Sequence, residues 1–412
     1  MSSSANGIGR WQGAGLMATT LLGTGVFILP QMTIAIAQQQ ALLAWALLTA
    51  MMLPVALVFG RLSGVLPHAA GPAYFVEKAF GLNAGRSIGL IFLLVVPIGA
   101  PAALLMTFEF VTSVIPLSGI GLLVGQGLAL LSLWLLNRKG LQISAKLQFA
   151  LTLAIVAVVV TMLLALSATP LPQVTSHDIE WRNLSPMLQA AGVAFWSFLG
   201  IEAMTHLSKE FKDPKRDMLP AMSLGVLLVG VLYLCCCYLL IDIKPGDGLA
   251  MVVAFDRLFG GYGALVIGVL GSASGLATVN VYAASTSRLM ASFAEQGILP
   301  TVLARKNRYG VPMLALTLLL SVNGLVLLFA YLSNQSLHDL ISWSNGVFVL
   351  IYGASMLAAT RLLGRRFRRL AWLGLLPCFA LAWGLGWQML YALAVLAIAV
   401  LFLSRKRLIN TG

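Results

Sequence analysis

Long apolar runs separated by short polar loops recur from one end of this chain to the other. An α-helix needs about 20 apolar residues to cross the hydrocarbon core of a bilayer. Of the 412 residues, 59% are hydrophobic and only 9% are charged, which leaves too little polar surface to cover a soluble domain of this length. The sequence therefore predicts an all-α polytopic membrane protein. The twelve expected crossings are residues 8–36, 41–65, 84–113, 120–137, 144–168, 184–207, 219–242, 258–292, 312–332, 336–361, 370–386 and 388–404.

The last two of these runs are shorter than the others. They meet at a tight turn near Gly386 and Trp387. This pattern fits either two full spans or one tilted hairpin, so the sequence leaves eleven or twelve crossings open.

The net charge of +13 has a topological explanation. Alternating the loops between two sides puts 23 of the 26 Lys and Arg residues on the side of the termini, and three on the other, namely Arg182, Lys244 and Arg257. Loops rich in Lys and Arg stay in the cytoplasm. We therefore predict cytoplasmic termini and no nucleic-acid partner. The cluster from Arg361 to Arg369 also fits contacts with anionic headgroups.

No pattern of reactive residues indicates an enzyme. Cys235, Cys236 and Cys237 are consecutive, and neighbouring helical positions point about 100° apart, so they do not form a metal site. Cys378 lies alone in another apolar run. Because no nucleophile–histidine–acid order, phosphate loop or metal-ligand spacing is present, we expect neither catalysis nor a metal or organic cofactor.

The first apolar run contains an interruption, in the stretch LLGTGVFILP at 21–30. Gly23, Thr24 and Gly25 weaken a helix where lipid supplies no alternative hydrogen-bond partner for the backbone. A helix broken here directs the positive N-terminal end of its second half at the bilayer midplane, where it can hold a carboxylate. Taken alone, the same glycines also fit a packing face of small residues.

A second interruption matches the first. The stretch AFWSFLGIEAMTH at 194–206 carries a central Gly200, which lies 177 residues after Gly23, and each interruption opens a set of five crossings. Because five is odd, the two sets are inverted in the membrane, and paired broken helices in an inverted repeat indicate a midplane binding site. The predicted divisions are a tail 1–7, repeats 8–168 and 184–362, a periplasmic loop 169–183 and a C-terminal pair 363–412.

The second interruption also contains the candidates for proton chemistry. Glu202 lies near mid-span, where a carboxylate must be neutral, paired or hydrated. It fits a proton relay, which we favour, or a structural carboxyl bonded to unwound backbone. Trp196 and Phe198 fit a lid over an apolar side chain or ordinary core packing. His206 fits a polar anchor at the helix end better than an extension of a proton path.

Several motifs together resemble the amino acid, polyamine and organocation transporter superfamily over residues 8–405. They are GTGVFILP at 23–30, FWSFLGIEA at 195–203, SRLMASFAEQGILP at 287–300 followed by GVP, and the loop PHAAGPAYFVEKAFG at 67–81. Within the superfamily, PIGAPAALL at 97–105 and the short loops are most similar to bacterial exporters of L-methionine and branched-chain amino acids.

This resemblance implies a five-plus-five inverted-repeat fold with the substrate among helices 1, 3, 6, 8 and 10. By this resemblance, the Gly23–Gly25 turn matches the family's carboxylate site, the carbonyl of Leu21 matches the group that receives the amine, and Trp196 matches an aromatic gate. Glu202 corresponds to the acidic residue of proton coupling. Phe198 and Gly200 belong to the same broken helix, and in helix 8 the resemblance adds Tyr282 near a gating aromatic and Asn280 beside it.

Departures from related transporters narrow the substrate. Helix 3 is apolar where relatives for cationic amino acids are polar, at Val95, Val96, Pro97, Gly99, Ala100 and Pro101. Helix 5 has only Lys146, near its start, and so lacks the mid-helix lysine that replaces sodium in some relatives. Ser285, Thr286 and Ser287 fit sodium ligands, although hydroxyls in membrane helices more often bond to their own backbone.

Together with this resemblance, the sequence predicts a secondary transporter of the bacterial inner membrane that carries neutral apolar L-amino acids, such as methionine, leucine, isoleucine and valine, by proton antiport. Export, as the direction of transport, is implied by the resemblance alone. Its partners are these amino acids, protons and the lipid bilayer, and its oligomeric state is left open. An importer or exchanger of the same fold is one alternative. A membrane sensor that binds amino acids without transporting them is another.

Overall fold

The computed structural model describes residues 8–140, 145–168, 183–243 and 248–411. The predicted tail 1–7, nearly all of the predicted loop 169–183, and the side chain of Lys146 lie outside the described residues.

The described chain is built from helices, without named strands. The α-helices are α1 (Arg10–Leu22), α2 (Leu29–Ala37), α3 (Gln40–Val65), α4 (Pro72–Phe80), α5 (Leu82–Val114), α6 (Gly119–Arg138), α7 (Ala145–Ala168), α8 (Ser185–Ala194), α9 (Ile201–His206), α10 (Pro214–Leu240), α11 (Ala250–Phe259), α12 (Gly263–Glu295), α13 (Met313–Leu332), α14 (Leu337–Leu362), α15 (Arg365–Leu385) and α16 (Met389–Thr411). Four 3₁₀ turns are η1 (Phe195–Phe198), η2 (Ser208–Glu210), η3 (Thr301–Ala304) and η4 (Gly386–Gln388).

Ten stretches of the described chain are long and apolar enough to cross a membrane. The pair α1 and α2 is not among them, because the interruption leaves each piece too short. The stretch Arg365–Arg405 counts once but contains two helices, α15 and α16, separated by η4. Twelve crossings therefore stay a prediction.

Two short helices lie outside the predicted crossings. The run predicted at 258–292 begins instead at Gly263, because Gly260 adopts a left-handed conformation that ends α11. The loop 67–81 contains α4, which starts at Pro72, a residue suited to the first turn of a helix.

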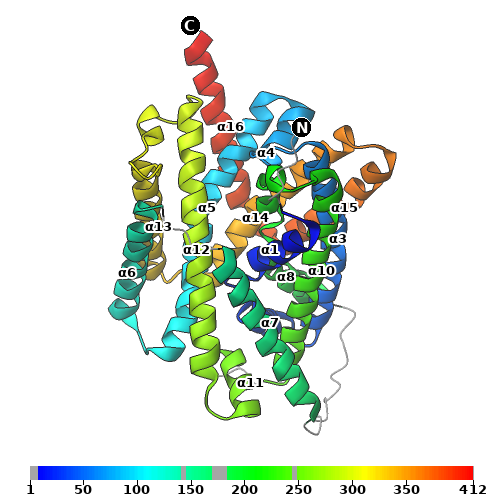
Figure 1. Cartoon of the computed structure of the whole chain (residues 1–412), viewed down its shortest axis with the longest axis vertical. Helices are drawn as coiled ribbons and strands as arrows, with labels where there is room; N and C mark the ends of the chain where they lie inside the picture. Colours follow the sequence, from blue (N-terminus) through cyan, green and yellow to red (C-terminus); the bar gives the residue numbers. More distant parts are fainter. Residues whose placement is uncertain (1–7, 141–144, 169–182, 244–247, 412) are drawn as a thin grey trace.

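Within the bundle, two groups of helices pack against one another most extensively (Figure 1). Helix α10 packs along α3 and α1, and α5 packs along α12 and α14. At the centre of the first group, Trp45 of α3 stacks on Tyr233 of α10 with ring centroids 4.4 Å apart. Helices α6 and α13 lie at one edge of the view and pack on each other, and most of α6 is not covered by protein.

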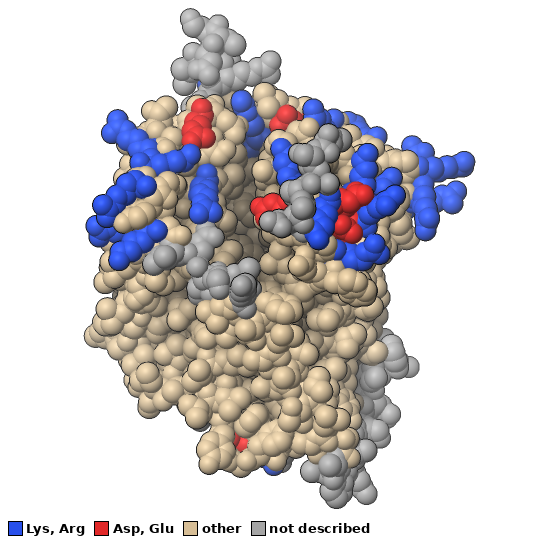
Figure 2. Space-filling view, in the orientation of Figure 1, with Lys and Arg blue, Asp and Glu red and all other residues tan. Residues whose placement is uncertain are grey.

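Basic side chains gather at the end of the molecule where α1 begins and α16 ends (Figures 1 and 2). The tan surface below them carries few charged side chains in this view, as expected of a surface that faces lipid. This distribution agrees with the lopsided Lys and Arg count from which the orientation was predicted.

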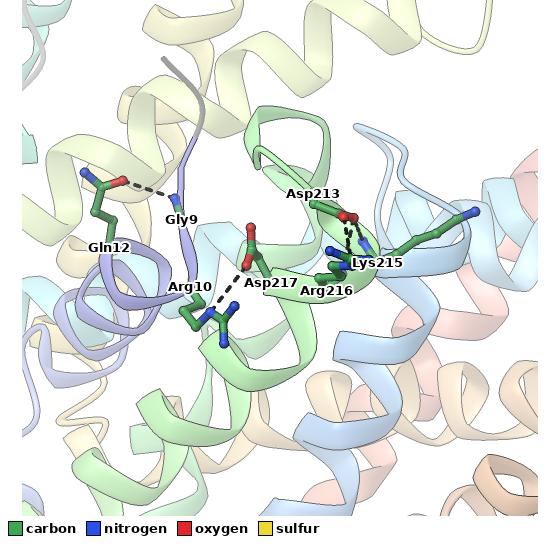
Figure 3. Close-up of polar contacts among 7 residues, drawn as sticks. All are labelled: Gly9, Arg10, Gln12, Asp213, Lys215, Arg216 and Asp217. Carbon is green, nitrogen blue, oxygen red and sulfur yellow. Dashed lines mark hydrogen bonds and ion pairs between the residues drawn. The ribbon is translucent and has the colours of Figure 1, made fainter. Parts of the chain in front are cut away.

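At this basic end the start of α1 is attached to the start of α10 (Figure 3). The Arg10 Nε atom lies 3.7 Å from the Asp217 carboxylate. The amide of Ile8 donates to the carbonyl of Glu210 at 2.9 Å, and the amide of Lys212 donates back to Ile8 at 3.0 Å. Asp213 caps α10 by accepting from the amides of its first turn. Helices α1 and α10 are therefore joined at this end by both backbone and side chains.

Candidate functional site

The first interruption is a turn between α1 and α2. Residues 23–28 leave the helix, and the amides of Ile28 and Leu29 both donate to the carbonyl of Gly25, at 3.1 and 2.9 Å. Among the described residues, the amides from Thr24 to Phe27 have no acceptor. The carbonyl of Leu21 consequently lacks its donor four residues along. The turn thus presents unpaired backbone groups inside the membrane region.

The second interruption lies between α8 and α9. The 3₁₀ turn η1 ends at Phe198, Leu199 is extended, and Gly200 has φ +128°. A Cβ atom at Gly200 would lie 2.9 Å from the Thr20 side chain and 3.1 Å from that of Leu21. The structure therefore brings the two interruptions, 177 residues apart in sequence, into direct contact.

A cavity opens where these two interruptions meet. Its lining from the interruptions is Leu21, Gly23, Thr24, Gly25, Trp196 and Leu199, together with Thr20 of α1. Helix α5 supplies Val95, Val96, Gly99, Ala100 and Ala103, α12 supplies Thr278, Val279 and Tyr282, and α14 supplies Phe348. Six of the nine substrate-binding residues predicted from sequence therefore line one cavity.

The cavity is mostly apolar, and the described lining contains no acid, Lys, Arg or His. The Thr20 and Thr278 hydroxyls donate to carbonyls of their own helices, at 2.8 and 3.0 Å. Ser274 of α12 donates to the carbonyl of Gly23 at 2.8 Å, so this carbonyl is already paired. The polar groups of the lining that have no partner among the described residues include the amides of the first turn and the side-chain hydroxyls of Thr24 and Tyr282.

Three predicted residues lie away from this lining. The Asn280 side chain accepts a hydrogen bond from Asn137 of α6 at 2.5 Å, which places it between α12 and α6 and not at the cavity. Helix α12 is rotated so that Val279 and Tyr282 face the cavity, and Asn280 therefore lies on another face of the helix. Phe198 is fully buried, and Gly200 packs against α1.

Glu202 is completely buried beside the second interruption and does not line the cavity. Its Oε2 atom accepts from the Gly200 amide at 2.9 Å and lies 2.5 Å from the hydroxyl oxygen of Tyr352. The same hydroxyl oxygen lies 2.9 Å from the carbonyl oxygen of Phe198. The other carboxyl oxygen, Oε1, has no partner among the described residues. Glu202 therefore links α9 and the second interruption to α14.

The sequence prediction did not include Tyr352. Its only signal was a phenol within the apolar run 336–361, on a helix expected to lie beside the substrate. A phenol in an apolar span does not reveal which backbone carbonyl or carboxyl it reaches, because that depends on how α14 packs against η1 and α9.

His206 ends α9 and contacts the loop that precedes α4. Its Nδ1 atom lies 2.6 Å from the carbonyl oxygen of Ala69, and Gly71, with φ +49°, approaches the same histidine ring closely. This contact agrees with the interpretation of His206 as a polar anchor.

The candidate sodium ligands do not converge. Ser285 and Ser287 donate to carbonyls of their own helix at 3.1 and 3.0 Å, and Thr286 has a buried hydroxyl without a partner among the described residues. The described residues contain no group of three or more His, Cys, Asp or Glu side chains arranged for a metal ion.

Comparison with known proteins identifies the family. The amino acid permease family matches residues 8–411. The chain is 35% identical to the L-methionine/branched-chain amino acid exporter YjeH of Escherichia coli K12. The aligned region covers 100% of this chain and 99% of YjeH. It is 28% identical to the uncharacterized amino acid permease YecA of Bacillus subtilis 168, over 96% of this chain and 95% of YecA. An uncharacterized transporter of Mycobacterium tuberculosis is 31% identical over a region that covers 38% of this chain and 34% of that transporter. The chain therefore belongs to the amino acid permease family.

Proposed function

We propose that this protein is a secondary transporter of the bacterial inner membrane that exports neutral apolar L-amino acids in exchange for protons. Methionine, leucine, isoleucine and valine are the proposed substrates. Full-length similarity to an exporter of methionine and branched-chain amino acids supports this substrate class and is the reason for proposing export. The proposal includes twelve crossings, the two inverted repeats and cytoplasmic termini.

The observation that carries the proposal is the chemistry of the cavity. Unpaired amides of the first turn suit a carboxylate, and the carbonyl of Leu21 suits an ammonium group. The remaining lining, from α5, Trp196 and Phe348, is apolar and uncharged. A cationic or acidic side chain would be buried here without a partner at a large free-energy cost, whereas an aliphatic one is accommodated.

Hydrogen counting around Glu202 supports proton coupling. The Tyr352 hydroxyl has one proton but lies within hydrogen-bond distance of both the Phe198 carbonyl and the Glu202 carboxyl. Both contacts are hydrogen bonds only when Glu202 carries a proton, which it donates to Tyr352 while Tyr352 donates to Phe198. An ionised Glu202 would compete with the carbonyl for that one proton and leave a charged Oε1 atom buried without a partner. We therefore assign a protonated Glu202 to this conformation.

Loss of the Glu202 proton would trigger the movement of the helices. When Glu202 is ionised, the Tyr352 hydroxyl redirects its hydrogen bond from the Phe198 carbonyl to the carboxylate. The second interruption then loses the bond between η1 and α14, while Glu202 stays bonded to Tyr352. The group formed by α1, α2, α3, α8, α9 and α10 is then free to rock against α5, α12 and α14. In this scheme Glu202 binds one proton on one side of the membrane and releases it on the other side in each full transport cycle.

Transport by the purified protein in proteoliposomes tests the proposal. We expect radiolabelled leucine and methionine to move against their gradients when a pH gradient is imposed, and lysine and glutamate not to move. Flux that requires amino acid on the opposite side and ignores the pH gradient would make the protein an exchanger. Binding without any flux would make it a sensor.

A further inference from the structure

A second cavity lies at the basic end and shares no lining residue with the cavity described above. It has a volume of about 360 Å³ and lies between the end of α6 and the segment before α13. Its lining is Arg138, Lys139, Asn307, Arg308, Tyr309 and Met313. Nothing in the proposed transport cycle uses this cavity.

Asn307 holds the two sides of this cavity together. Its side-chain amide donates to the carbonyl of Arg138 at 2.9 Å, and its side-chain oxygen accepts from the amides of Tyr309 and Val311 at 2.9 and 3.1 Å. These bonds fix Arg308 on the same side as Arg138 and Lys139. The three cations are therefore brought together by a built turn and not by chance on a mobile surface.

No described acidic side chain pairs with these three cations. Among the described residues, Arg138, Lys139 and Arg308 form no ion pair, whereas nearby Lys306 pairs with Glu295 at 2.9 Å. The sequence has no Asp or Glu in 110–177 or in 296–338, so neither flanking segment supplies one. Three cations around one cavity repel each other unless an anion joins them.

Aromatic rings orient the two guanidinium groups. The Arg138 guanidinium lies 5.6 Å from the centroid of Trp134, and that of Arg308 lies 4.8 Å from the centroid of Tyr309. Trp134 also donates to the Thr317 hydroxyl at 2.9 Å, which joins α6 to α13. Trp and Tyr beside Arg at a helix end are typical of the boundary between lipid and water.

The helices below the cavity have apolar faces without a protein partner. Leu131 and Leu135 on α6, and Leu314 and Leu318 on α13, are each about half exposed. We propose that the cavity binds the phosphate of an anionic phospholipid from the leaflet at the basic face, with its acyl chains along α6 and α13. Paired arginine forks match the phosphate oxygens, and the exposed leucines cover the chains. The lipid would hold this edge of the α5–α12 group in the bilayer while the other group rocks.

Native mass spectrometry of the full-length protein with phosphatidylglycerol or phosphatidylcholine tests this site. We expect wild type to favour phosphatidylglycerol, and the double variant Arg138→Gln, Arg308→Gln to bind it on the order of 30-fold more weakly. Asn307→Ala keeps every charge and should still weaken phosphatidylglycerol binding, because it releases Arg308 from Arg138. This second variant therefore distinguishes binding that depends on the geometry of the turn from binding that depends on net charge alone.

The matched control is Lys215→Gln, Arg216→Gln at the start of α10, which removes the same charge from the same end (Figure 3). It should bind phosphatidylglycerol like wild type. Equal losses in both double variants, or no loss in the first, would contradict the proposal. So would millimolar inorganic phosphate that displaces phosphatidylglycerol, because the cavity would then bind free anions and not a lipid.

Discussion

At the scale of single residues, hydrogen-bond pairing inside the membrane depends on how many donor protons the buried side chains carry. Water cannot complete an unfinished hydrogen bond there, so each buried donor and acceptor needs a partner from the chain. The contacts of Tyr352 with Glu202 and with the Phe198 carbonyl are both hydrogen bonds only when Glu202 carries a proton. Tyr233, equally buried, has a hydroxyl without a partner among the described residues.

Changing Glu202→Gln should separate substrate binding from proton coupling. The amide has nearly the same shape, and its NH₂ group can donate to Tyr352 as the protonated carboxyl does. We expect leucine binding to persist and the pH dependence of flux to flatten, because the residue no longer titrates. Flux measured in proteoliposomes across a series of pH values checks this.

Glu109→Gln is the control for this experiment. Glu109 is also a carboxylate on a long apolar helix, α5, but it is exposed and lies outside the cavity. Its variant should keep the wild-type pH profile. An unchanged profile in Glu202→Gln as well would remove Glu202 from the coupling role.

Two buried tyrosines provide an internally matched stability test. Tyr352→Phe removes the group that contacts Phe198 and Glu202, and should lower the free energy of unfolding by about 1–3 kcal/mol. Tyr233→Phe removes a hydroxyl that has no partner, and should leave stability unchanged or increase it. Denaturant unfolding of both variants in detergent measures the difference. Equal effects would mean that the Tyr352 hydroxyl is no better paired than that of Tyr233.

At the scale of elements, the two interruptions contact each other and line the same cavity. The first turn depends on Gly23 and Gly25, and Pro30 suits the first turn of α2. The second depends on Gly200, whose φ of +128° is open to glycine but strained for other residues. Because the two interruptions touch, a change in one moves the lining contributed by the other.

Gly200→Ala should therefore damage both the fold and the site. Its methyl group would meet Thr20 and Leu21 at about 3 Å, and strained backbone costs about 1–3 kcal/mol. We expect lower stability and weaker leucine binding, measured by thermal unfolding with and without leucine. Gly127→Ala in α6, where a Cβ meets nothing within 4 Å, should be neutral or stabilising. Wild-type binding in Gly200→Ala would contradict the assigned contact between the interruptions.

At the scale of the whole molecule, the distribution of basic side chains predicts the orientation in the membrane. Most of the basic side chains in view lie at the end where α1 begins and α16 ends, and the opposite end carries few charges (Figure 2). Ser118 and Ser333 are exposed residues just after α5 and α13, whereas Ser404 lies near the C-terminal end of α16.

Cysteine labelling checks this orientation in a variant without the four native cysteines. Ser118→Cys and Ser333→Cys should react with a membrane-impermeant thiol reagent added to intact spheroplasts. Ser404→Cys should react only after the membrane is opened. The reverse pattern would place the termini outside, and labelling of all three from outside would contradict the predicted number of crossings.

Much of the architecture was predictable because its signals are local. Apolar runs of bilayer length located most of the helices to within a few residues, since lipid requires each spanning segment to satisfy its own backbone. The glycines of both interruptions were found for the same reason. The eleven-or-twelve question and the separate helix α11 were harder, because short helices at a membrane boundary depend on their neighbours more than on composition.

By itself, the sequence determined the class of protein, the positions of the two interruptions and the excess of basic residues on one side, which each depend on residues close together along the chain. Only the tertiary structure decided which faces of the helices meet. It placed Tyr282 at the cavity and Asn280 against α6, and it joined Tyr352 to Glu202. It also brought Arg138 and Arg308 around one cavity. Helix rotation and contact are set by packing over the whole molecule, and no local pattern contains that information.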